Sequence, residues 1–426
     1  MRILIAGTTY YPAVNGQAIF TINLAEGLAR HGHEVLLITH SMREKPYKII
    51  RNGVKIFGVH SISLTRWNPG AYLSLFPGEP VRQVFRSFKP DVVHIQDHYP
   101  ISWSIANLGH KYAIPVAGTN HFMPENLAPY MHGVSWFKPG FNWALWKWML
   151  GLYNHLSVAT APSRTAAEIM RKNGLRIPVF PISCGVDQQR FRPIADIDRQ
   201  AMRQRYNLKT DRYTLLFVGR VDGEKRIDLL LQALHMIDRD DIQLAIAGQG
   251  AAENTLKKLA QDLNLGDRVQ FTGYIPDEDL PGLLNSVDVF AMPSEAELLS
   301  IASLEALSCG RPIVAANAQA LPELVDPGFN GYLFNPGNVR DAARVIQLML
   351  HQKDRWPEMQ AASLEKVKTH SLDYTLRRYE QVYELMLSGA LQPDKGARAA
   401  QHPQQPIWAR QLKSYAQEVD VHIKKK

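Results

Sequence analysis

The chain alternates between short apolar runs and longer segments in which apolar residues recur every three or four positions. RILIAG at 2–7 and DVVHIQ at 91–96 are runs of the first kind, and they predict buried strands. GQAIFTINLAEGLARHG at 16–32 is of the second kind and predicts a helix that ends at a glycine. Because near-continuous apolar strands that alternate with helices are typical of parallel sheets covered on both faces, we expect an α/β protein with doubly wound parallel sheets.

The alternation occurs in two blocks. In the first block we expect further strands at 33–39, 53–59, 114–120, 156–163 and 178–187, and helices at 81–90 and 101–113. A polar, charged stretch over about 191–211 then predicts a linker with a short helix. The second block supplies strands at 213–219, 242–248, 269–273, 287–293 and 312–317. We therefore expect two Rossmann-like domains that face a cleft, with ligands at the carboxyl ends of the strands.

The last part of the chain departs from this alternation. SLDYTLRRYEQVYELMLSG at 371–389 has the periodicity of an amphipathic helix. Residues 391–426 are rich in Gln, Pro and Ala and end in three lysines, which predicts a weakly ordered, basic tail.

Composition narrows the class of protein. A chain of 426 residues is too long for one ordinary core, and 46% hydrophobic with 21% charged residues suits a soluble globular protein. Cys184 and Cys309 lie far apart, so they indicate neither a disulfide framework nor a metal cluster and fit a reducing cytosol. The first apolar run meets Gly7 too early for a secretory signal, and no apolar run reaches membrane-spanning length. We expect a cytoplasmic protein.

The formal net charge is +8, and the tail from Leu391 contributes seven Lys and Arg against three Asp and Glu. A basic protein can bind nucleic acid, anionic lipid or phosphorylated substrates. Charge alone does not choose among these partners.

Two glutamates follow the strand expected at 287–293. Glu297 falls in the loop beyond the strand, and Glu305 lies in the helical segment IASLEALSC. Ser300 suits the N-cap of that helix, whose first N–H groups would form an anion site of the kind that holds phosphate. Glu305 could then accept hydrogen bonds from vicinal hydroxyls. A solvated loop and a solvated helix face explain both glutamates as well, because carboxylates are mostly surface residues.

Two cations follow the strand expected at 213–219. Arg220 and Lys225 lie in the loop GRVDGEK, which begins at Gly219. Such a pair suits a diphosphate, since Arg binds phosphate in a bidentate manner and Lys acts as a point charge. A solvated turn is the alternative interpretation.

Two further candidates follow strands of the first block. Gly16 begins the first helix after TTYYPAVN and could let backbone approach a phosphate or sugar. The loop is not a G-x-G-x-x-G, so it does not support a nicotinamide site. His121 follows the strand expected at 114–120; a lone histidine is more often structural, but this one falls at the expected cleft.

The segment 135–156 holds Trp136, Trp143, Trp146 and Trp148, half of the eight tryptophans in the chain. Aromatic residues interspersed with lysines suit contact at the headgroup level of a membrane. A helix packed in the core fits the same pattern. Acidic pairs elsewhere lie away from strand ends, and no His or Cys spacing suits a metal site.

In combination these motifs resemble the retaining glycosyltransferases of family 4, which have the GT-B fold. The likeness rests on Gly16 after the first strand, on GRVDGEK, on FTGYIP at 271–276 and on the Glu297/Glu305 pair, and it covers about residues 1–390. It implies an acceptor-side domain over 1–190 and a nucleotide-sugar-binding domain over 191–370. It also implies a helix over 371–390 that crosses back to the first domain, followed by the basic tail at 391–426.

The resemblance assigns roles to individual residues. It implies that Arg220 and Lys225 hold the donor diphosphate, that Glu297 binds hydroxyls of the donor sugar, and that His121 orients this sugar. It implies that Glu305 holds the ribose and that Gly16 approaches the diphosphate from the other domain. The remaining expected donor contacts are Gly219, the base-binding residues Thr272, Gly273, Tyr274 and Ile275, and the sugar- and phosphate-binding residues Leu299, Ser300 and Ile301.

The resemblance also predicts the reaction. We expect transfer of a hexose with retention of the anomeric configuration. The donor would be UDP-glucose, GDP-mannose or a similar nucleotide diphosphate sugar, and the acceptor a hydroxyl of a membrane lipid such as diacylglycerol or a glycolipid. We expect neither a cofactor nor a metal. We expect association with the cytoplasmic face of a membrane through residues 135–156 and the tail. A nucleotide-sugar 2-epimerase and a non-enzymatic binder of anionic surfaces are the alternatives. The binder leaves the cleft motifs unexplained, and we do not expect nucleic acid as a partner.

Overall fold

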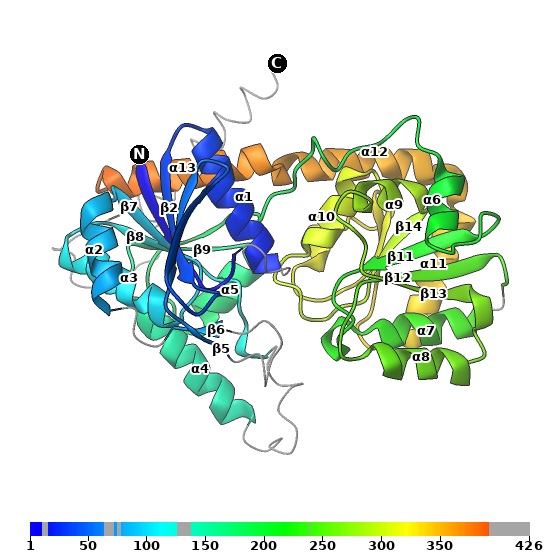
Figure 1. Ribbon diagram of the computed structural model, residues 1–426. Helices are drawn as coiled ribbons and strands as arrows, with labels where there is room; N and C mark the ends of the chain where they lie inside the picture. The colour runs from blue at the N-terminus through cyan, green and yellow to red at the C-terminus, as the bar shows by residue number, and fades with distance from the viewer. Residues whose placement is uncertain (11–15, 64–71, 75–77, 126–137, 238, 392–426) are drawn as a thin grey trace.

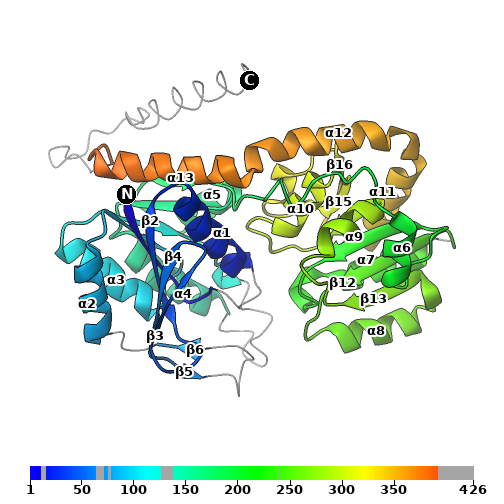
Figure 2. The ribbon, with the colours of Figure 1, turned by 45° about the horizontal axis from the view of Figure 1, so that its top comes forward.

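The computed structural model describes residues 1–10, 16–63, 72–74, 78–125, 138–237 and 239–391 (Figure 1). The tail at 392–426, for which we predicted weak order, lies outside the described residues. Two sheets lie side by side, each between layers of helices, and one long helical segment runs along both (Figures 1 and 2). This is the α/β architecture that the alternation predicted.

The first sheet has eight strands in the order β10-β9-β8-β7-β1-β2-β4-β3, and β3 is the one antiparallel strand of this sheet. Its strands are β1 (Arg2–Ala6), β2 (Glu34–His40), β3 (Tyr47–Arg51), β4 (Val54–Val59), β7 (Val92–Ile95), β8 (Val116–Thr119), β9 (Val158–Ala161) and β10 (Val179–Pro181). Its helices are α1 (Gly16–Arg30), α2 (Gly78–Phe88), α3 (Pro100–Lys111), α4 (Lys138–Tyr153) and α5 (Arg164–Lys172). A small hairpin pairs β5 (Ile62–Ser63) with β6 (Tyr72–Leu73).

The second sheet is parallel throughout, in the order β13-β12-β11-β14-β15-β16. Its strands are β11 (Tyr213–Val218), β12 (Ile242–Ala247), β13 (Val269–Gly273), β14 (Val289–Met292), β15 (Ile313–Ala316) and β16 (Gly331–Phe334). Its helices are α6 (Arg199–Arg205), α7 (Ile227–Met236), α8 (Glu253–Asp262), α9 (Leu280–Ser286), α10 (Ile301–Ser308), α11 (Val339–His351) and α12 (Trp356–Val367).

The strands that the apolar pattern predicted are present, with ends shifted by a few residues. Four strands escaped prediction: the two-residue strands β5 and β6, and the edge strands β3 and β16. β3 is an edge strand whose central residues are exposed, Ile50 among them, so it lacks the apolar run of a buried strand. β16 is the edge strand of the second sheet beside β15, and its two central residues are only partly buried.

The helix after α12 crosses back to the first sheet, as the resemblance predicted (Figure 2). This helix, α13 (Leu372–Leu387), buries Leu376, Tyr379 and Tyr383 in the core of the first half. The Tyr383 hydroxyl lies 2.7 Å from His94 Nδ1 on β7, and the Tyr379 hydroxyl lies 3.3 Å from Thr119 Oγ1 on β8. The C-terminal helix therefore stabilises the N-terminal sheet. The residue boundaries that we gave for the domains stay a prediction.

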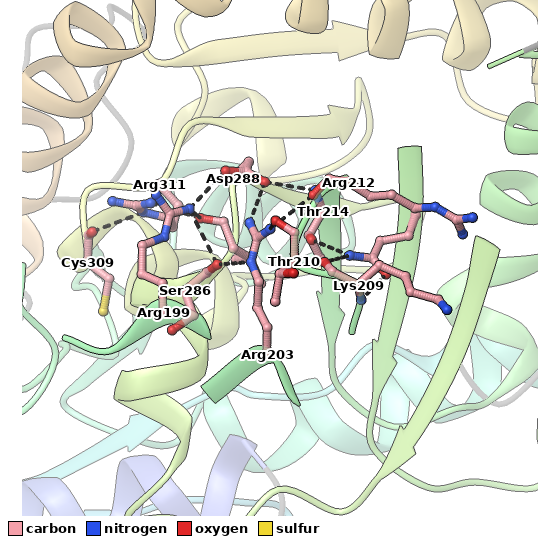
Figure 3. A network of polar contacts seen from close by, with 12 residues as sticks. Arg199, Arg203, Lys209, Thr210, Arg212, Thr214, Ser286, Asp288, Cys309 and Arg311 are labelled. Carbon is pink, nitrogen blue, oxygen red and sulfur yellow. Dashed lines mark hydrogen bonds and ion pairs between the residues drawn. The ribbon is translucent and has the colours of Figure 1, made fainter. Parts of the chain in front are cut away.

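The polar linker is fastened to the second half by a network of arginines around Asp288 (Figure 3). Arg203 on α6 donates to Asp288 Oδ2 at 2.7 Å and to the carbonyl of Ser286 at 2.8 Å, and Arg199 donates to Asp288 Oδ1 at 2.9 Å. Asp288 precedes β14 and also accepts from the N–H of Thr214. The network lies at the amino ends of the strands, opposite the edge where ligands are expected, and we interpret it as structural.

Both sheets have a point where the strand order reverses. β1 lies between β2 and β7, and β11 lies between β12 and β14. Helices on the two sides of such a point diverge and leave a crevice beyond the carboxyl ends of the strands. Within the described part of the chain, no helix is long and apolar enough to cross a membrane.

Candidate functional site

The carboxyl edges of the two sheets face each other at the first turns of α1 and α10 (Figure 1). A Cβ atom added to Gly16, at the start of α1, would lie 3.8 Å from Ile301 Cδ1, at the start of α10. Leu299 and Ile301 pack against the N-terminal core, and Leu298 is buried in it. The loop after β14 therefore joins the two halves and brings two helix N-termini together.

Ser300 is the N-cap of α10, as the sequence predicted. Its hydroxyl accepts a hydrogen bond from the N–H of Ser303 at 3.2 Å, and its backbone is extended. The N–H groups of Ile301 and Ala302 have no partner among the described residues. Free N–H groups and the positive end of a helix favour an anion, so this turn can hold a phosphate or a sugar hydroxyl.

Lys225 and Glu297 form an ion pair in the cleft. Lys225 Nζ lies 2.5 Å from Glu297 Oε1, although 72 residues separate them, and both side chains are largely buried. β11 and β14 are neighbours in the sheet, which explains why the loops that follow them meet. Glu297 precedes the N-cap residue of α10 by three positions, so the pair lies in the loop that leads into this helix.

Arg220 points its guanidinium at two carboxylates of its own loop. It donates to Asp222 Oδ2 and to Glu224 Oε1, both at 2.6 Å, and its side chain is half exposed. Both cations that the sequence singled out are thus paired in this structure. A diphosphate would share or replace these carboxylate contacts, and charge-assisted hydrogen bonds of this kind are strong.

Glu305 lies on the second turn of α10 and carries the most perturbed carboxyl of the site. Burial raises its pKa to about 8; the negative charge of Asp277 also raises it, and the positive charge of Arg190 opposes the shift. Among the described residues, its carboxyl group has no hydrogen-bond partner. A partly accessible carboxyl group without a partner, in a cleft, is suited to accept hydrogen bonds from hydroxyls of a ligand.

His121 follows β8 and lies on the N-terminal side of the cleft. Its Nε2 is 3.3 Å from Gln96 Oε1, and its ring packs on Phe20 of α1 at 4.7 Å between centroids. Burial lowers its pKa to about 3, so the ring is neutral at physiological pH. A neutral imidazole can donate or accept a hydrogen bond but carries no charge into the site.

The segment after β13 has one exposed aromatic residue. Gly273 has a positive φ of 70°, Tyr274 is exposed and Ile275 is buried, while Thr272 Oγ1 donates to the carbonyl of Ile246. The turn presents backbone and a tyrosine ring next to Gly248, whose N–H donates to the Gly273 carbonyl at 2.8 Å.

Two glycines that follow β12 were not predicted as site residues. A Cβ atom at Gly248 would lie 1.9 Å from the Gly219 carbonyl oxygen, and one at Gly250 would lie 2.4 Å from that of Val221. The two loops can pack this closely only without side chains. The spacing AGQG directly after a strand was a signal that could have found them. Gln96, which directly follows β7, was missed as well.

The Trp-rich segment at 135–156 has both a side packed in the core and a side exposed to solvent, the two alternatives that the sequence left open. Trp146 on α4 is buried in the core and donates to Glu125 Oε1 at 2.9 Å. Trp143 and Trp148 are exposed, at 63% and 43%, and Lys147 Nζ lies 4.8 Å from the centre of the Trp143 ring. Trp136 lies outside the described residues. α4 thus has one face in the core and one aromatic, cationic face in solvent.

A second contact joins the two halves at the end of the cleft near α13. The carboxylate of Glu323 accepts from the N–H groups of Arg164 and Thr165, at 3.1 and 2.7 Å, and so caps α5 from the other half. A cavity of about 600 Å³ lies next to it, lined by residues that include His370 and Arg378. Among the described residues, no group of three or more His, Cys, Asp or Glu is arranged to hold a metal ion.

Comparisons with known proteins agree with this arrangement. Residues 14–190 match the family described as Glycosyltransferase Family 4, and residues 198–366 match Glycosyl transferases group 1. The chain is 26% identical to a GDP-mannose-dependent alpha-mannosyltransferase of Corynebacterium glutamicum, over 86% of this chain and 85% of that protein. It is 24% identical to the alpha-monoglucosyldiacylglycerol synthase of Streptococcus pneumoniae, over 92% and 88%. The structure of a sucrose-phosphate synthase from Thermosynechococcus elongatus superposes with a TM-score of 0.77, at 21% identity, and covers 91% of this chain and 100% of that one.

Proposed function

The chain belongs to glycosyltransferase family 4 and has the GT-B fold, and on this premise we propose that it moves a hexose, with retention, from a nucleotide diphosphate sugar to a hydroxyl of a membrane lipid. The observation that carries the proposal is the convergence at the cleft: the first turns of α1 and α10 meet beside the Lys225–Glu297 pair. Helix N-termini and cations attract a diphosphate, and the carboxylates suit hydroxyls.

The donor would bind mainly to the second half. Arg220 and Lys225 would hold the diphosphate, together with the backbone of Ser300 and Ile301, and Glu297 would bind hydroxyls of the sugar. Glu305, partly buried and without a partner for its carboxyl group among the described residues, would accept from the ribose hydroxyls. The remaining contacts would be those of the base with residues 272–275, of the sugar with Leu299 and His121, and of the diphosphate with Gly16 and Gly219.

The chemistry needs charge stabilisation on the leaving group. As the bond between the anomeric carbon and the diphosphate oxygen breaks, negative charge grows on the diphosphate, and Arg220 and Lys225 would stabilise it by preorganised electrostatics without a metal. The acceptor oxygen bonds to the anomeric carbon and its proton passes to the departing diphosphate. His121 has a pKa of about 3, which suits orientation of the sugar and not removal of a proton near pH 7.

The acceptor is proposed to be a lipid, such as diacylglycerol or a glycolipid. The exposed face of α4, with Trp143, Lys147 and Trp148, supports contact with a membrane surface at its cytoplasmic face. The chain is similar both to a GDP-mannose-dependent mannosyltransferase and to a monoglucosyldiacylglycerol synthase. GDP-mannose and a nucleotide diphosphate glucose are therefore both candidate donors.

A thermal-shift panel with UDP-, GDP- and ADP-sugars tests the donor site. A ligand that binds only the folded chain raises its melting temperature, so one nucleotide sugar should stabilise the wild type by about several degrees. The Arg220→Ala/Lys225→Ala variant should lose that shift. The matched control is Lys257→Ala/Arg344→Ala, which removes one lysine and one arginine from exposed ion pairs of the same half and should keep it. A panel without any shift would contradict the proposal.

The sugar that stabilises the chain is then offered with diacylglycerol in anionic vesicles. A glycolipid product whose anomeric configuration matches the donor, as measured by NMR, supports retaining transfer. Conversion of the sugar without an acceptor would instead indicate an epimerase.

A further inference from the structure

The histidine of the cleft is held on two sides by residues that belong to different elements. Phe20 of α1 packs on one side of the His121 ring, and the Gln96 side chain, which follows β7, reaches Nε2. β7 and β8 are neighbours in the first sheet, so the residues that follow them come together at its carboxyl edge. The orientation of His121 therefore depends on Gln96.

Gln96 is itself fixed in place more firmly than a surface glutamine. Its backbone N–H donates to Ala6 at 2.8 Å, its carbonyl accepts from Gln17 Nε2 at 3.0 Å, and the residue is 0% exposed. A Cβ atom at Gly7 would lie 2.9 Å from Gln96 Cβ, so the close approach of β1 also requires a glycine there. The side chain has little freedom to move away from His121.

The amide of Gln96 is only half satisfied. Its oxygen contacts His121, but its buried Nε2 has no partner among the described residues. A buried N–H without a partner costs about 1–3 kcal/mol, and an apolar side chain of the same shape would avoid that cost. The fold therefore gains little from this amide, and a role at His121 accounts for its presence better than stability does.

We propose that Gln96 is a positioning residue, whose amide oxygen holds His121 in the tautomer with hydrogen on Nε2. The ring then offers Nδ1, a lone pair, as a hydrogen-bond acceptor for a hydroxyl of the donor sugar. That His121 meets a donor sugar rests on the proposed function, whereas the tautomer does not. Burial lowers the pKa of His121 to about 3, so the ring would accept the hydrogen bond without taking the proton.

Nitrogen chemical shifts of the His121 imidazole, assigned through a His121→Gln variant, test the tautomer. In the wild type the shifts should show hydrogen on Nε2 and a bare Nδ1. In Gln96→Met, which keeps the length of the side chain but removes the amide, they should show a mixture of the two tautomers. Hydrogen on Nδ1 in the wild type, or unchanged shifts in Gln96→Met, would overturn the proposal whatever the enzyme does.

Gln243 offers a matched control in the other half. It is equally buried, at 1% exposed, but both atoms of its amide are bonded. The amide oxygen accepts from the N–H of Lys209, and the amide nitrogen donates to the Lys209 carbonyl and to Thr214 Oγ1. Gln243→Met leaves these partners unpaired and should lower the unfolding midpoint. Gln96→Met removes an unpaired N–H but also the acceptor of His121, so its midpoint should fall by less than that of Gln243→Met.

The catalytic effect should follow the opposite order. Gln96→Met should lower kcat/KM for the donor by about 3- to 10-fold, the size of one hydrogen bond, and leave KM for the acceptor unchanged. Gln243→Met, assayed below its melting temperature, should keep wild-type kcat/KM. If Gln96→Met is destabilised as much as Gln243→Met and keeps its tautomer and kcat/KM, Gln96 is structural. If no donor is turned over at all, the proposed function fails and the imidazole shifts still decide the role of Gln96.

Discussion

Glu305 shows how strongly the cleft changes a single residue. By sequence it is an ordinary helix glutamate, but in the structure burial raises the pKa of its carboxyl to about 8. The carboxyl is protonated in the folded chain at pH values where the unfolded chain, with a carboxyl pKa near 4.5, has lost the proton. Stability is therefore lost as pH rises from about 4.5 to about 8.

We predict that Glu305→Gln relieves this loss. At pH 5 wild type and variant should melt together, because the carboxyl is neutral in the folded chain. At pH 9 the variant should be more stable, by on the order of 2 kcal/mol, because no charge is then buried. Melting curves at the two pH values check this. Affinity for the stabilising nucleotide sugar should fall at both pH values. A variant that binds the donor with wild-type affinity would show that Glu305 does not contact the ribose.

At the scale of elements, the start of α10 combines a structural and a functional role. Ser300 caps α10 through Ser303 N–H, and Asn338 caps α11 in the same way through Asp341 N–H. None of the residues proposed to contact the donor belongs to α11. The two caps therefore form a natural pair for separating helix stability from ligand binding.

Ser300→Ala and Asn338→Ala should each lower the free energy of unfolding by about 1 kcal/mol, the usual contribution of an N-cap. Only Ser300→Ala should also weaken donor binding, because it loosens the turn whose N–H groups face the ligand. Denaturant unfolding and calorimetric titration of the stabilising nucleotide sugar measure the two effects. Equal donor affinity in both variants would show that the first turn of α10 does not contact the donor.

α4 has a buried and an exposed aromatic face, and only the second can contact a membrane. Trp143→Ala/Trp148→Ala should reduce sedimentation with anionic vesicles by about 10-fold, with only a small fall in melting temperature, because Trp143 is exposed and Trp148, 43% exposed, packs edge to face with His98. Phe329→Ala, which removes an exposed aromatic side chain from the second half, is the control and should bind as the wild type does. Binding that persists in the double variant would exclude α4 as the membrane contact.

For the whole molecule, buried His94 and the partly buried His121 and His370 link stability to acid. Burial lowers the pKa of His94 and His121 to about 3 and that of His370, with help from Lys366, to about 4. Their unfolded pKa is near 6.5, so the unfolded chain takes up protons that the folded chain refuses. The contribution of these neutral histidines to the free energy of unfolding is fully present above about pH 6.5 and is lost as the pH falls toward 3.

We expect a loss on the order of 1–2 kcal/mol for each of these histidines between pH 7 and pH 5, seen as a lower denaturant midpoint. His94→Gln should reduce this acid-dependent loss, although it lowers stability at pH 7 by disturbing the bonds to Tyr383 and Thr119. His110→Gln, which replaces an exposed histidine, should change neither the acid-dependent loss nor the stability at pH 7. If the wild type is equally stable at pH 5 and pH 7, these histidines are not buried in the neutral form.

The sequence by itself determined what depends on near neighbours along the chain. Apolar periodicity predicted the buried strands and several of the helices. Ser300 was identified as a cap from the residues beside it, because a cap bonds to an N–H three residues away. The order of motifs after the strands was enough to place Arg220, Lys225, Glu297 and Glu305 at one edge of a sheet. The edge strands β3 and β16 were missed, since the central residues of β3 are exposed and those of β16 are only partly buried.

Only the tertiary structure decided what depends on residues far apart in sequence. The Lys225–Glu297 pair spans 72 positions, Gln96 meets His121 across two strands, and Gly16 meets Ile301 from the opposite half. Burial, which sets the raised pKa of Glu305 and separates Trp146 from Trp143 and Trp148, is likewise a property of the packed molecule. Local patterns carry no record of these distances, because strand order and the return of α13 bring together segments that the sequence keeps apart.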